Sequence, residues 1–405
     1  MGENRSLSNG QEGNVPKLRF PGFEGEWENT ELGNLVVYGK DKTRVTKNHY
    51  VSTENIEQDF RGIIPFEDAE TIVDGTEFTK GDVLIANIRP YLKKVWQSNM
   101  YGACNADVLV MKPQEIDNDF LYNLIAQNRF IDYVMGGVKG SKMPRGDKAH
   151  ILQYNTAVPS IVEQRQIARF LSLLSNRITM QKKLIETLKK YKRGLLRAYF
   201  MTNERTAHSL WEKCKLGVLC SKIGSGKTPR GGSSVYVNHG IMFLRSQNVL
   251  WGMLDISNVS YINEETNRTM LSSGVHYGDI LLNITGASIG RSCIYSLNDR
   301  ANVNQHVCVI RLSQEGKEKI LPNFLLQQIL SDHIQQQVSD CQNGGSREGL
   351  NFQQIAGFDI VLPEIEEQRK ICSMLNAFDK KMLSEECSLK ALFDFRTSLM
   401  QQLFI

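Results

Sequence analysis

The sequence predicts a mixed α/β protein in which two repeated globular domains are joined by two long antiparallel coiled-coil helices, with an internal pseudo-two-fold repeat. Three observations predict this fold class. The chain has 405 residues, several times the ~100–150 residues of a typical domain. One motif occurs twice, and a heptad pattern of apolar residues follows each copy. The 41% hydrophobic and 23% charged residues exclude a disordered chain, a collagen repeat and a polytopic membrane protein.

The repeat is anchored by the motif that begins each predicted long helix. Residues 158–167 (VPSIVEQRQI) recur 204 residues later as residues 362–371 (LPEIEEQRKI). Further short matches keep the same order along the chain and begin at residues 32, 81, 105 and 120 in the first copy and at residues 216, 278, 304 and 324 in the second. Chance matches would not stay in order over five anchors, so we predict a duplication whose second copy carries loop insertions.

The first part of each copy is predicted to be a strand-rich domain. Short Val, Ile and Leu runs such as residues 82–86 and 279–282 are separated by Gly, Asn and Asp, which is typical of strands and turns. Longer segments at 120–134 and 324–338 predict helices between them. We therefore expect a disordered tail at 1–14, globular domains at 15–158 and 204–362, and helices at 159–203 and 363–405.

The second part of each copy carries the seam of a coiled coil. Apolar residues alternate at spacings of four and three, from Ile167 to Tyr199 and again from Ile371 to Leu403. Two such helices in one chain can bury their seams against each other. Heptads alone do not distinguish parallel from antiparallel pairing, but the short connection after Phe200 favours antiparallel pairing. The first helix is strongly basic between Arg177 and Arg197, either to complement the second helix or to face DNA.

Catalytic motifs are weak or incomplete in this sequence. Residues 223–229 (IGSGKTP) resemble a P-loop, but Ser221 replaces its first glycine and Pro229 stands where a helix must follow. Residues 87–91 (NIRPY) faintly resemble the Asn-Pro-Pro-Tyr loop of amino-methyltransferases, without a glycine-rich cofactor loop. The histidines and cysteines show no metal-ligand spacing. We predict no catalytic residue and no metal site, while a stand-alone nucleotide-binding enzyme, a methyltransferase and a non-DNA coiled-coil adaptor stay as alternatives.

Basic, amide and hydroxyl side chains cluster in loops that contain Gly and Ser. Arg, Lys, Asn and Gln read base edges in the major groove, and Ser, Thr and Lys hold phosphates. For any one of these residues, a solvated loop surface is the simpler interpretation. The candidate DNA-binding residues are Lys40, Lys42, Arg44, Lys47, Lys139, Ser141, Lys142, Arg145, Ser225, Lys227, Thr228, Arg230, Arg245, Gln247, Asn248, Arg291, Ser346 and Arg347.

The chain resembles the specificity subunits of type I restriction–modification enzymes over essentially its whole length. The resemblance rests on the opening at residues 15–27, the Leu-Gly starts of both copies, the Gly-Ser-Gly-Lys-Thr-Pro loop, and the two Pro-x-x-x-Glu-Gln-Arg helix starts. It implies a non-catalytic subunit in which each globular domain is a target recognition domain. Each domain would read one half of a bipartite DNA target, and the helices would set the gap between the halves.

The resemblance also implies the partners of this chain. They are double-stranded DNA, two modification (methyltransferase) subunits and restriction (translocase/nuclease) subunits. S-adenosylmethionine, ATP and Mg are then expected in the partner subunits and no cofactor in this chain. The implied partner-binding residues are Glu163, Gln164, Arg165, Glu367, Gln368 and Arg369. A cytoplasmic location without a membrane is expected, because no apolar run approaches membrane length and the cysteines suggest reduced thiols.

The two copies differ in their loops. The first copy lacks the Gly-Ser-Gly-Lys-Thr-Pro loop, and residues 139–142 (KGSK) stand where the second copy has residues 344–347 (GGSR). This difference fits two domains that read different bases.

Overall fold

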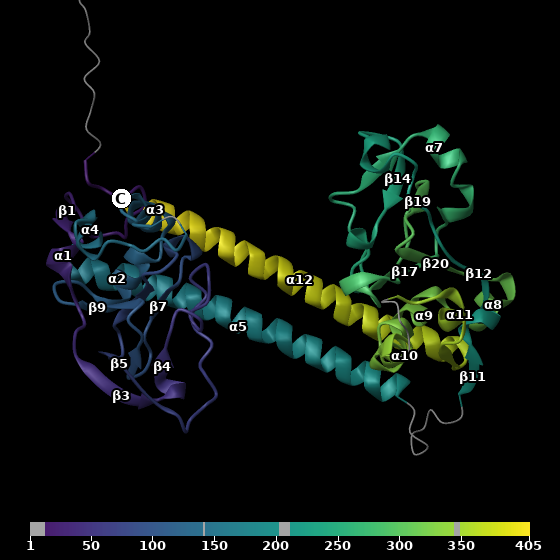
Figure 1. Cartoon of the computed structure of the whole chain (residues 1–405), viewed down its shortest axis with the longest axis horizontal. Helices are drawn as coiled ribbons and strands as arrows, with labels where there is room; N and C mark the ends of the chain where they lie inside the picture. Colours follow the sequence, from purple (N-terminus) through teal and green to yellow (C-terminus); the bar gives the residue numbers. More distant parts are fainter. Residues whose placement is uncertain (1–12, 141, 202–210, 344–348) are drawn as a thin grey trace, which may run out of the picture. The chain divides into compact units, whose positions relative to one another are not determined.

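The computed structural model describes residues 13–140, 142–201, 211–343 and 349–405 (Figure 1). Of the predicted tail, only Gly13 and Asn14 lie within the described residues. The chain divides into two compact units. Unit 1 combines Met1–Lys182 with Cys387–Ile405, and unit 2 is Lys183–Glu386. Both boundaries fall inside long helices, so that α5 (Ile161–Phe200) and α12 (Ile365–Leu403) each contribute one part to each unit.

Unit 1 contains two four-stranded sheets and one strand pair. The first sheet has the order β2 (Val36–Tyr38), β9 (Val108–Pro113), β6 (Val83–Ala86) and β7 (Val95–Gln97). The second has the order β3 (Lys42–Thr46), β5 (Ile72–Phe78), β8 (Gly102–Cys104) and β4 (Tyr50–Val51). Strand β1 (Glu28–Glu31) pairs with β10 (Asn155–Val158). The short helices are α1 (Leu32–Leu35), α2 (Asn118–Ile125), α3 (Asn128–Gly136) and α4 (Lys148–Leu152).

Unit 2 repeats this plan with an enlarged second sheet. Its first sheet has the order β12 (Cys220–Ser225), β20 (Val307–Leu312), β17 (Ile280–Asn283) and β18 (Ser292–Ile294). Its second has the order β13 (Tyr236–Val237), β15 (Ser260–Ile262), β14 (Ile241–Leu244), β19 (Ala301–Val303) and β16 (Gly274–Val275). Strand β11 (Glu212–Lys215) pairs with β21 (Asp359–Leu362). The short helices are α6 (Leu216–Leu219), α7 (Glu264–Arg268), α8 (Gln314–Lys319), α9 (Pro322–Ile329), α10 (Asp332–Asn343) and α11 (Phe352–Ala356). The predicted mixed α/β repeat is confirmed.

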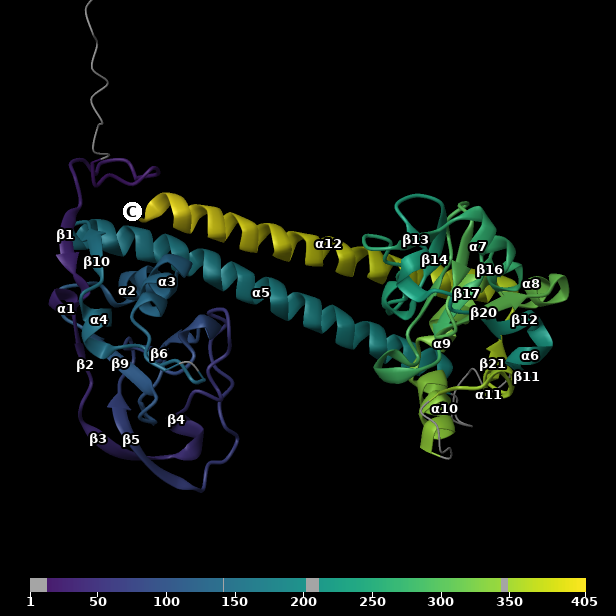
Figure 2. The ribbon, with the colours of Figure 1, turned by 45° about the horizontal axis from the view of Figure 1, so that its top comes forward.

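The first sheet of each unit is a middle layer, and this explains its uninterrupted apolar strands. In unit 1, Figures 1 and 2 show this sheet between the helices and the β3–β5–β8–β4 sheet. On β6, Val83 and Ile85 join the core with the helices, whereas Leu84 joins the core between the two sheets. On β17, Ile280 and Leu282 likewise face one core and Leu281 faces another. Because successive strand side chains point to opposite faces, both faces must be apolar.

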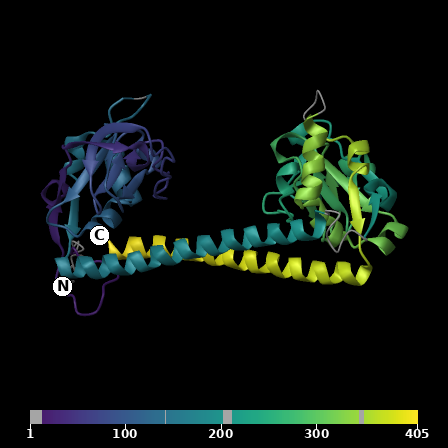
Figure 3. The same ribbon diagram turned by 90° about the horizontal axis from the view of Figure 1, so that it is seen from below.

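The long helices are antiparallel within each unit. In unit 2, Lys189 Nζ lies 3.2 Å from Glu386 Oε1, and Lys192 Nζ lies 2.6 Å from Asp379 Oδ1, so later residues of α5 meet earlier residues of α12. In unit 1, the end of α12 lies beside the beginning of α5 (Figure 3), with Leu403 in the same core as Ile167. The predicted antiparallel pairing is confirmed, and carboxylates of α12 neutralise part of the positive charge of α5.

Each globular domain shares its core with the helix pair of its unit. In unit 1, the Phe120 ring on α2 lies between Trp27, at 6.2 Å, and Phe404, at 5.2 Å, measured between ring centroids. In unit 2, Phe324 on α9 packs edge-on against Phe200 at the end of α5, at 5.4 Å. The helix pair is therefore part of the hydrophobic core of both units.

The Gln of each Glu-Gln-Arg motif ties the start of a long helix to the globular domain. Gln164 Oε1 accepts a hydrogen bond from the Asp117 backbone N–H at 2.9 Å, and its Nε2 donates to the Pro159 carbonyl at 2.9 Å. Gln368 accepts from the Leu321 N–H and donates to the carbonyls of Lys319 and Pro363, with distances of 2.8–2.9 Å. Asp117 and Leu321 are the N-caps of α2 and α9. In both copies, the glutamine therefore connects the start of the long helix to the start of α2 or α9.

We predict that Gln164→Leu destabilises the protein by about 2–4 kcal/mol, because it leaves a backbone N–H and a carbonyl without their partner. Chemical denaturation followed by circular dichroism measures this loss as a lower midpoint. Gln166→Leu, two residues further along α5 at an exposed position, is the matched control and should change the midpoint little. Equal effects of both substitutions would contradict the assigned role of Gln164.

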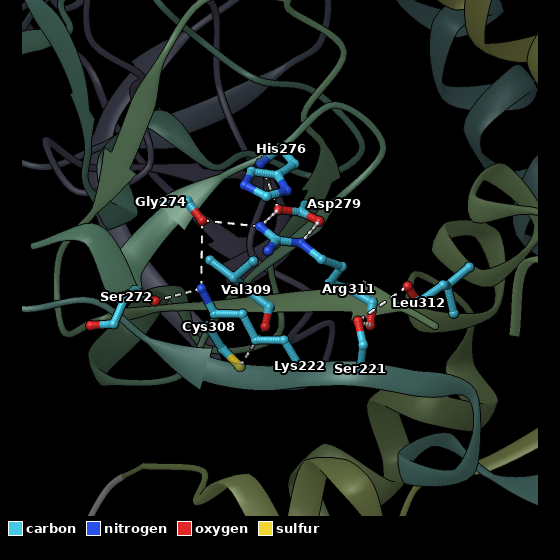
Figure 4. Close-up of polar contacts among 10 residues, drawn as sticks. All are labelled: Ser221, Lys222, Ser272, Gly274, His276, Asp279, Cys308, Val309, Arg311 and Leu312. Carbon is cyan, nitrogen blue, oxygen red and sulfur yellow. Dashed lines mark hydrogen bonds and ion pairs between the residues drawn. The ribbon is translucent and has the colours of Figure 1, made fainter. Parts of the chain in front are cut away.

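A buried ion pair lies within the first sheet of unit 2 and is not repeated among the described residues of unit 1, and its arginine also donates to the second sheet. Arg311 on β20 donates from Nε and Nη2 to the two carboxylate oxygens of Asp279, at 2.8 and 2.7 Å (Figure 4). Arg311 Nη2 and Lys222 Nζ also donate to the Gly274 carbonyl of β16, at 3.0 and 3.5 Å. Burial, together with the nearby guanidinium, lowers the pKa of Lys222. The carboxylates of Asp279 and of its unit 1 counterpart Asp82 both accept a backbone N–H from three residues earlier, from His276 and Thr79.

We expect Arg311→Met to destabilise the chain by about 3 kcal/mol, because the Asp279 carboxylate, with 2% of its side chain exposed, would lose its countercharge. Thermal unfolding of purified chains measures the effect. Arg300→Met removes the similar but exposed pair with Glu264 and should cost below about 1 kcal/mol. If Arg311→Met were as mild as Arg300→Met, the pair would not be structural.

Candidate nucleic-acid interface

The Gly-Ser-Gly-Lys-Thr-Pro loop follows β12 and packs against the turn between β19 and β20. The Gly226 N–H donates to the Asn304 carbonyl at 3.1 Å, and a Cβ at Gly226 would overlap the Val303 carbonyl oxygen, so only glycine fits. Residues 226–231 are not helical. The loop therefore lacks the helix that a P-loop needs for phosphate binding. Lys227, Thr228 and Arg230 are exposed on it, and Ser225 is half-buried at the end of β12.

Three other segments of unit 2 meet this loop through a chain of contacts. The Thr228 hydroxyl donates to Gln305 Oε1. Gln305 Nε2 lies 3.0 Å from His306 Nε2, and His306 Nδ1 lies 2.5 Å from the Thr285 hydroxyl. Thr285 also forms an isolated bridge with Gly349. The chain thus joins the ends of β12 and β17, the β19–β20 turn and the segment at Gly349. The predicted residues Ser346 and Arg347 lie outside the described residues.

The remaining predicted residues of unit 2 divide between exposed and internal positions. Gln247 is exposed, and Arg291 is half-buried. Arg245 lies with its guanidinium 5.6 Å from the Tyr236 ring centroid. Asn248 is buried, accepting from the Arg245 N–H at 3.0 Å and donating to the Asp255 carbonyl at 2.9 Å. Its amide shapes the loop, so we correct our expectation that it reads DNA.

In unit 1, the loop that corresponds to the segment at Gly349 is a tight loop that carries Arg145. The backbones of Lys139 and Arg145 form hydrogen bonds with each other in both directions, and Arg145 also bridges Ile88. Arg145 Nη2 lies 2.9 Å from Asp107 Oδ1, so the exposed guanidinium forms an ion pair with this carboxylate. Lys139 pairs with Asp147, Lys142 is exposed, and Ser141 lies outside the described residues. The loop therefore presents cations beyond the end of β6.

The cluster at residues 40–47 lies on the second sheet of unit 1. Arg44 is exposed but pairs with Asp74 across β3 and β5 at 2.7 Å. Lys42 donates to Thr76 at 3.0 Å, and Lys47 lies over the Phe66 ring at 5.4 Å. Lys40 is exposed. Partners within unit 1 thus occupy three of the four basic side chains. This makes the cluster a weaker candidate than the Arg145 loop.

Three of the six predicted partner-binding residues are buried. Glu163 is 1% exposed and accepts two hydrogen bonds from Arg19, both at 2.8 Å, a contact that raises the pKa of Arg19. Gln164 and Gln368 are buried in the contacts described above. We therefore correct the expectation for these three residues, which stabilise the helix starts. Arg165 and Arg369 are exposed and Glu367 is half-buried, so these three stay predictions as partner contacts.

Unit 1 also contains a basic groove that the sequence analysis did not identify. Its volume is about 630 Å³, and it lies between α2, α3, the start of α5 and the end of α12. Aromatic rings, including Tyr122 and Phe393, form part of its wall. Only one carboxylate, that of Asp59, lines it. Its cationic lining residues are Arg61, Lys93, Arg129, Lys182 and Arg396. They come from five separate segments, so only the basic run that includes Lys182 was visible in the sequence.

The described residues contain no group of three or more His, Cys, Asp or Glu side chains placed to hold a metal ion. Burial raises the pKa of the thiols of Cys104, Cys220, Cys293 and Cys308 to about 12. These thiols stay protonated near neutral pH and are poor nucleophiles. Over the same described residues, no helix is both long and apolar enough to cross a membrane.

Comparison with known proteins identifies the family. The family model described as type I restriction modification DNA specificity domain matches residues 24–190 and 208–392. A type I restriction enzyme specificity subunit (MjaVIII) of Methanocaldococcus jannaschii is 23% identical over 394 residues, covering 89% of this chain and 87% of that protein. The EcoBI specificity subunit of Escherichia coli is 32% identical over 135 residues, 33% of this chain and 28% of that protein.

Solved structures share the fold. The crystal structure of a type I restriction–modification S subunit from M. genitalium matches with a TM-score of 0.59 at 14% identity, covering 96% of this chain and 99% of that one. A chain from a structure of type I complex assembly and conformational transition matches with a TM-score of 0.58 at 16% identity, covering 92% and 96%. Because the family model matches most of the sequence in two successive segments, this chain belongs to the type I restriction modification DNA specificity family and carries two of its domains.

Proposed function

We propose that this chain is the non-catalytic subunit that reads DNA for a type I restriction–modification complex, with each unit reading one half of a bipartite target. One observation carries the proposal. Each unit holds most of one specificity domain, and in each unit an equivalent turn, before β9 or β20, contacts an exposed polar side chain: Asp107 pairs with Arg145, and His306 contacts Gln305. Different side chains held by equivalent turns suit two half-sites of different sequence.

The exposed loop residues have the chemistry for both kinds of DNA contact. Arg145, held by Asp107, has the planar fork that pairs bidentately with O6 and N7 of guanine. Lys227 and Arg230 are exposed on a loop without a carboxylate partner in the contacts described, which suits phosphates. The basic groove of unit 1 adds cations that suit the phosphate backbone. Contacts with base edges give sequence preference, and contacts with phosphates give affinity.

The paired helices suit two further tasks. A helix of 40 residues is about 60 Å long, and we propose that the pair sets the number of base pairs between the half-sites. Each unit also holds two exposed apolar side chains of α5 that are seven residues apart, so each pair lies on one face of the helix. They are Leu173 and Met180 in unit 1 and Leu184 and Tyr191 in unit 2.

We propose that these apolar side chains dock the modification subunits. Methyl transfer with S-adenosylmethionine and cleavage with ATP and Mg then belong to the partner subunits, and this chain supplies sequence recognition alone. Restriction subunits join the same complex in this proposal, and the cytoplasmic location stays a prediction. The loop at Gly226 supports the proposal over a stand-alone nucleotide-binding enzyme, because its backbone does not form a phosphate cradle.

The test of the proposed function is sequencing of DNA methylated by the complex of this chain with its modification subunit. We expect one bipartite sequence with an unread gap. Arg145→Ala should relax one position of one half-site, because a bidentate arginine–guanine contact contributes roughly 1–3 kcal/mol of discrimination. The other half-site should stay unchanged. Methylation without a defined sequence, or changes in both halves, would contradict the proposal.

Two companion variants complete this test. Lys182→Ala in the basic groove should weaken binding to all DNA sequences alike, without altering the recognised sequence. It should also lower the slope of log affinity against log salt concentration by about one, the value of one phosphate contact. Arg300→Ala, an exposed arginine already paired with Glu264, should leave affinity and sequence unchanged. A complex that forms without binding DNA would support the coiled-coil adaptor instead.

Docking of the modification subunit is tested on α5. We expect Met180→Glu and Tyr191→Glu each to weaken binding of the modification subunit roughly tenfold or more, because a charge replaces an apolar contact. The wild-type side chains are 66% and 60% exposed. Titration of the purified chain with the modification subunit gives the affinity. Lys190→Ala alters a neighbouring exposed residue that lies off the apolar face and is the control. Unchanged affinity of both Glu variants would exclude this face as the docking surface.

A further inference from the structure

We propose that Gln305 is a specificity-determining residue of unit 2, and that its side-chain amide reads an adenine in the major groove. The inference rests on the proposed function and extends it to a residue outside the loops first selected from the sequence. Gln305 is exposed at the turn between β19 and β20. Its amide, unlike that of a typical surface glutamine, is held at both ends by neighbouring side chains.

The contacts define which way the amide points. The Thr228 hydroxyl donates to Gln305 Oε1, and Gln305 Nε2 donates to His306 Nε2 at 3.0 Å. His306 in turn contacts the Thr285 hydroxyl through Nδ1 at 2.5 Å, so an Nδ1 proton and a free Nε2 lone pair satisfy both contacts. The backbone holds His306 as well, because its carbonyl accepts from the Ile284 N–H at 3.0 Å.

The held amide keeps one hydrogen-bonding edge available. A glutamine amide has two N–H groups and two carbonyl lone pairs, and the contacts with Thr228 and His306 use one of each. One N–H donor and one acceptor lone pair are left. This pair matches N7 and the N6 amino group of adenine, the bidentate contact that Gln and Asn make in the major groove. Ordering the side chain before binding also lowers the entropy lost on contact.

Comparison with unit 1 shows that the equivalent turn holds a different side chain there. The Asn87 N–H donates to the Asp107 carbonyl at 2.7 Å, just as the Ile284 N–H donates to the His306 carbonyl, so Asp107 and His306 are equivalent. The residue before Asp107 is Ala106, which takes the place of Gln305. Asp107 braces Arg145 instead. The same turn therefore braces an arginine in one unit and a glutamine in the other.

The test uses the complete complex of this chain with its modification subunit and a DNA library randomised in both half-sites. Bound DNA is sequenced. We expect Gln305→Ala to reduce the preference for adenine at one position of one half-site by roughly 5- to 100-fold. The fold should tolerate this change, because unit 1 has alanine at the equivalent turn. Gln305→Glu should exchange adenine for cytosine there, because a carboxylate only accepts and pairs with the cytosine amino group.

Two more variants distinguish a loss of base recognition from a structural effect of the substitution. Thr228→Val removes the hydroxyl that orients the amide and should cause a smaller loss at the same position. Gln353→Ala, an exposed glutamine on α11, should alter nothing. Unchanged selection by Gln305→Ala and Gln305→Glu, or a uniform loss at every position, would overturn the inference while leaving the proposed function intact. A wild-type complex that selects no sequence would contradict both.

Discussion

The buried glutamine at the start of each long helix is the contact on which the rest of each unit depends. It connects the first turn of α5 or α12 to the N-cap of α2 or α9, and its partners are backbone groups. Backbone partners fix distance and direction more strictly than apolar packing does, because hydrogen bonds are directional. The helix pair therefore holds a defined orientation against the globular domain of its unit, and the loops of that domain inherit this orientation.

Apolar packing also connects each globular domain to the long helices. Phe120 and Phe324 lie on equivalent helices and insert between the first sheet and the long helices of their own unit. The central strands β6 and β17 of the first sheet are buried on both faces, so they leave little freedom to exchange apolar for polar residues. Variation is confined to the ends of these strands, where loops are exposed. This division explains how one scaffold carries an Asp107–Arg145 pair in one copy and a Thr228–Gln305–His306 chain in the other.

Polar residues in this protein have two distinct uses, and burial separates them. Asn248, Gln164, Gln368 and Asp279 are buried and satisfied by partners inside their unit. Arg145, Lys227 and Gln305 are exposed, and two of them are also held by neighbours. A side chain that is both exposed and held is suited to recognition, because its geometry is set before a ligand arrives.

The sequence by itself determined the duplication, the mixed α/β class and the paired helices, because these depend on periodicity and on motifs that repeat in order. It also located the Arg145 loop and the loop at Lys227, where basic residues adjoin glycines. Only the tertiary structure decided that Glu163, Gln164, Gln368 and Asn248 are internal. The first three contact residues more than forty positions away, and Asn248 bonds to backbone groups within its own loop. The same holds for Gln305 and for the basic groove of unit 1, whose members come from separate segments that the fold alone brings together.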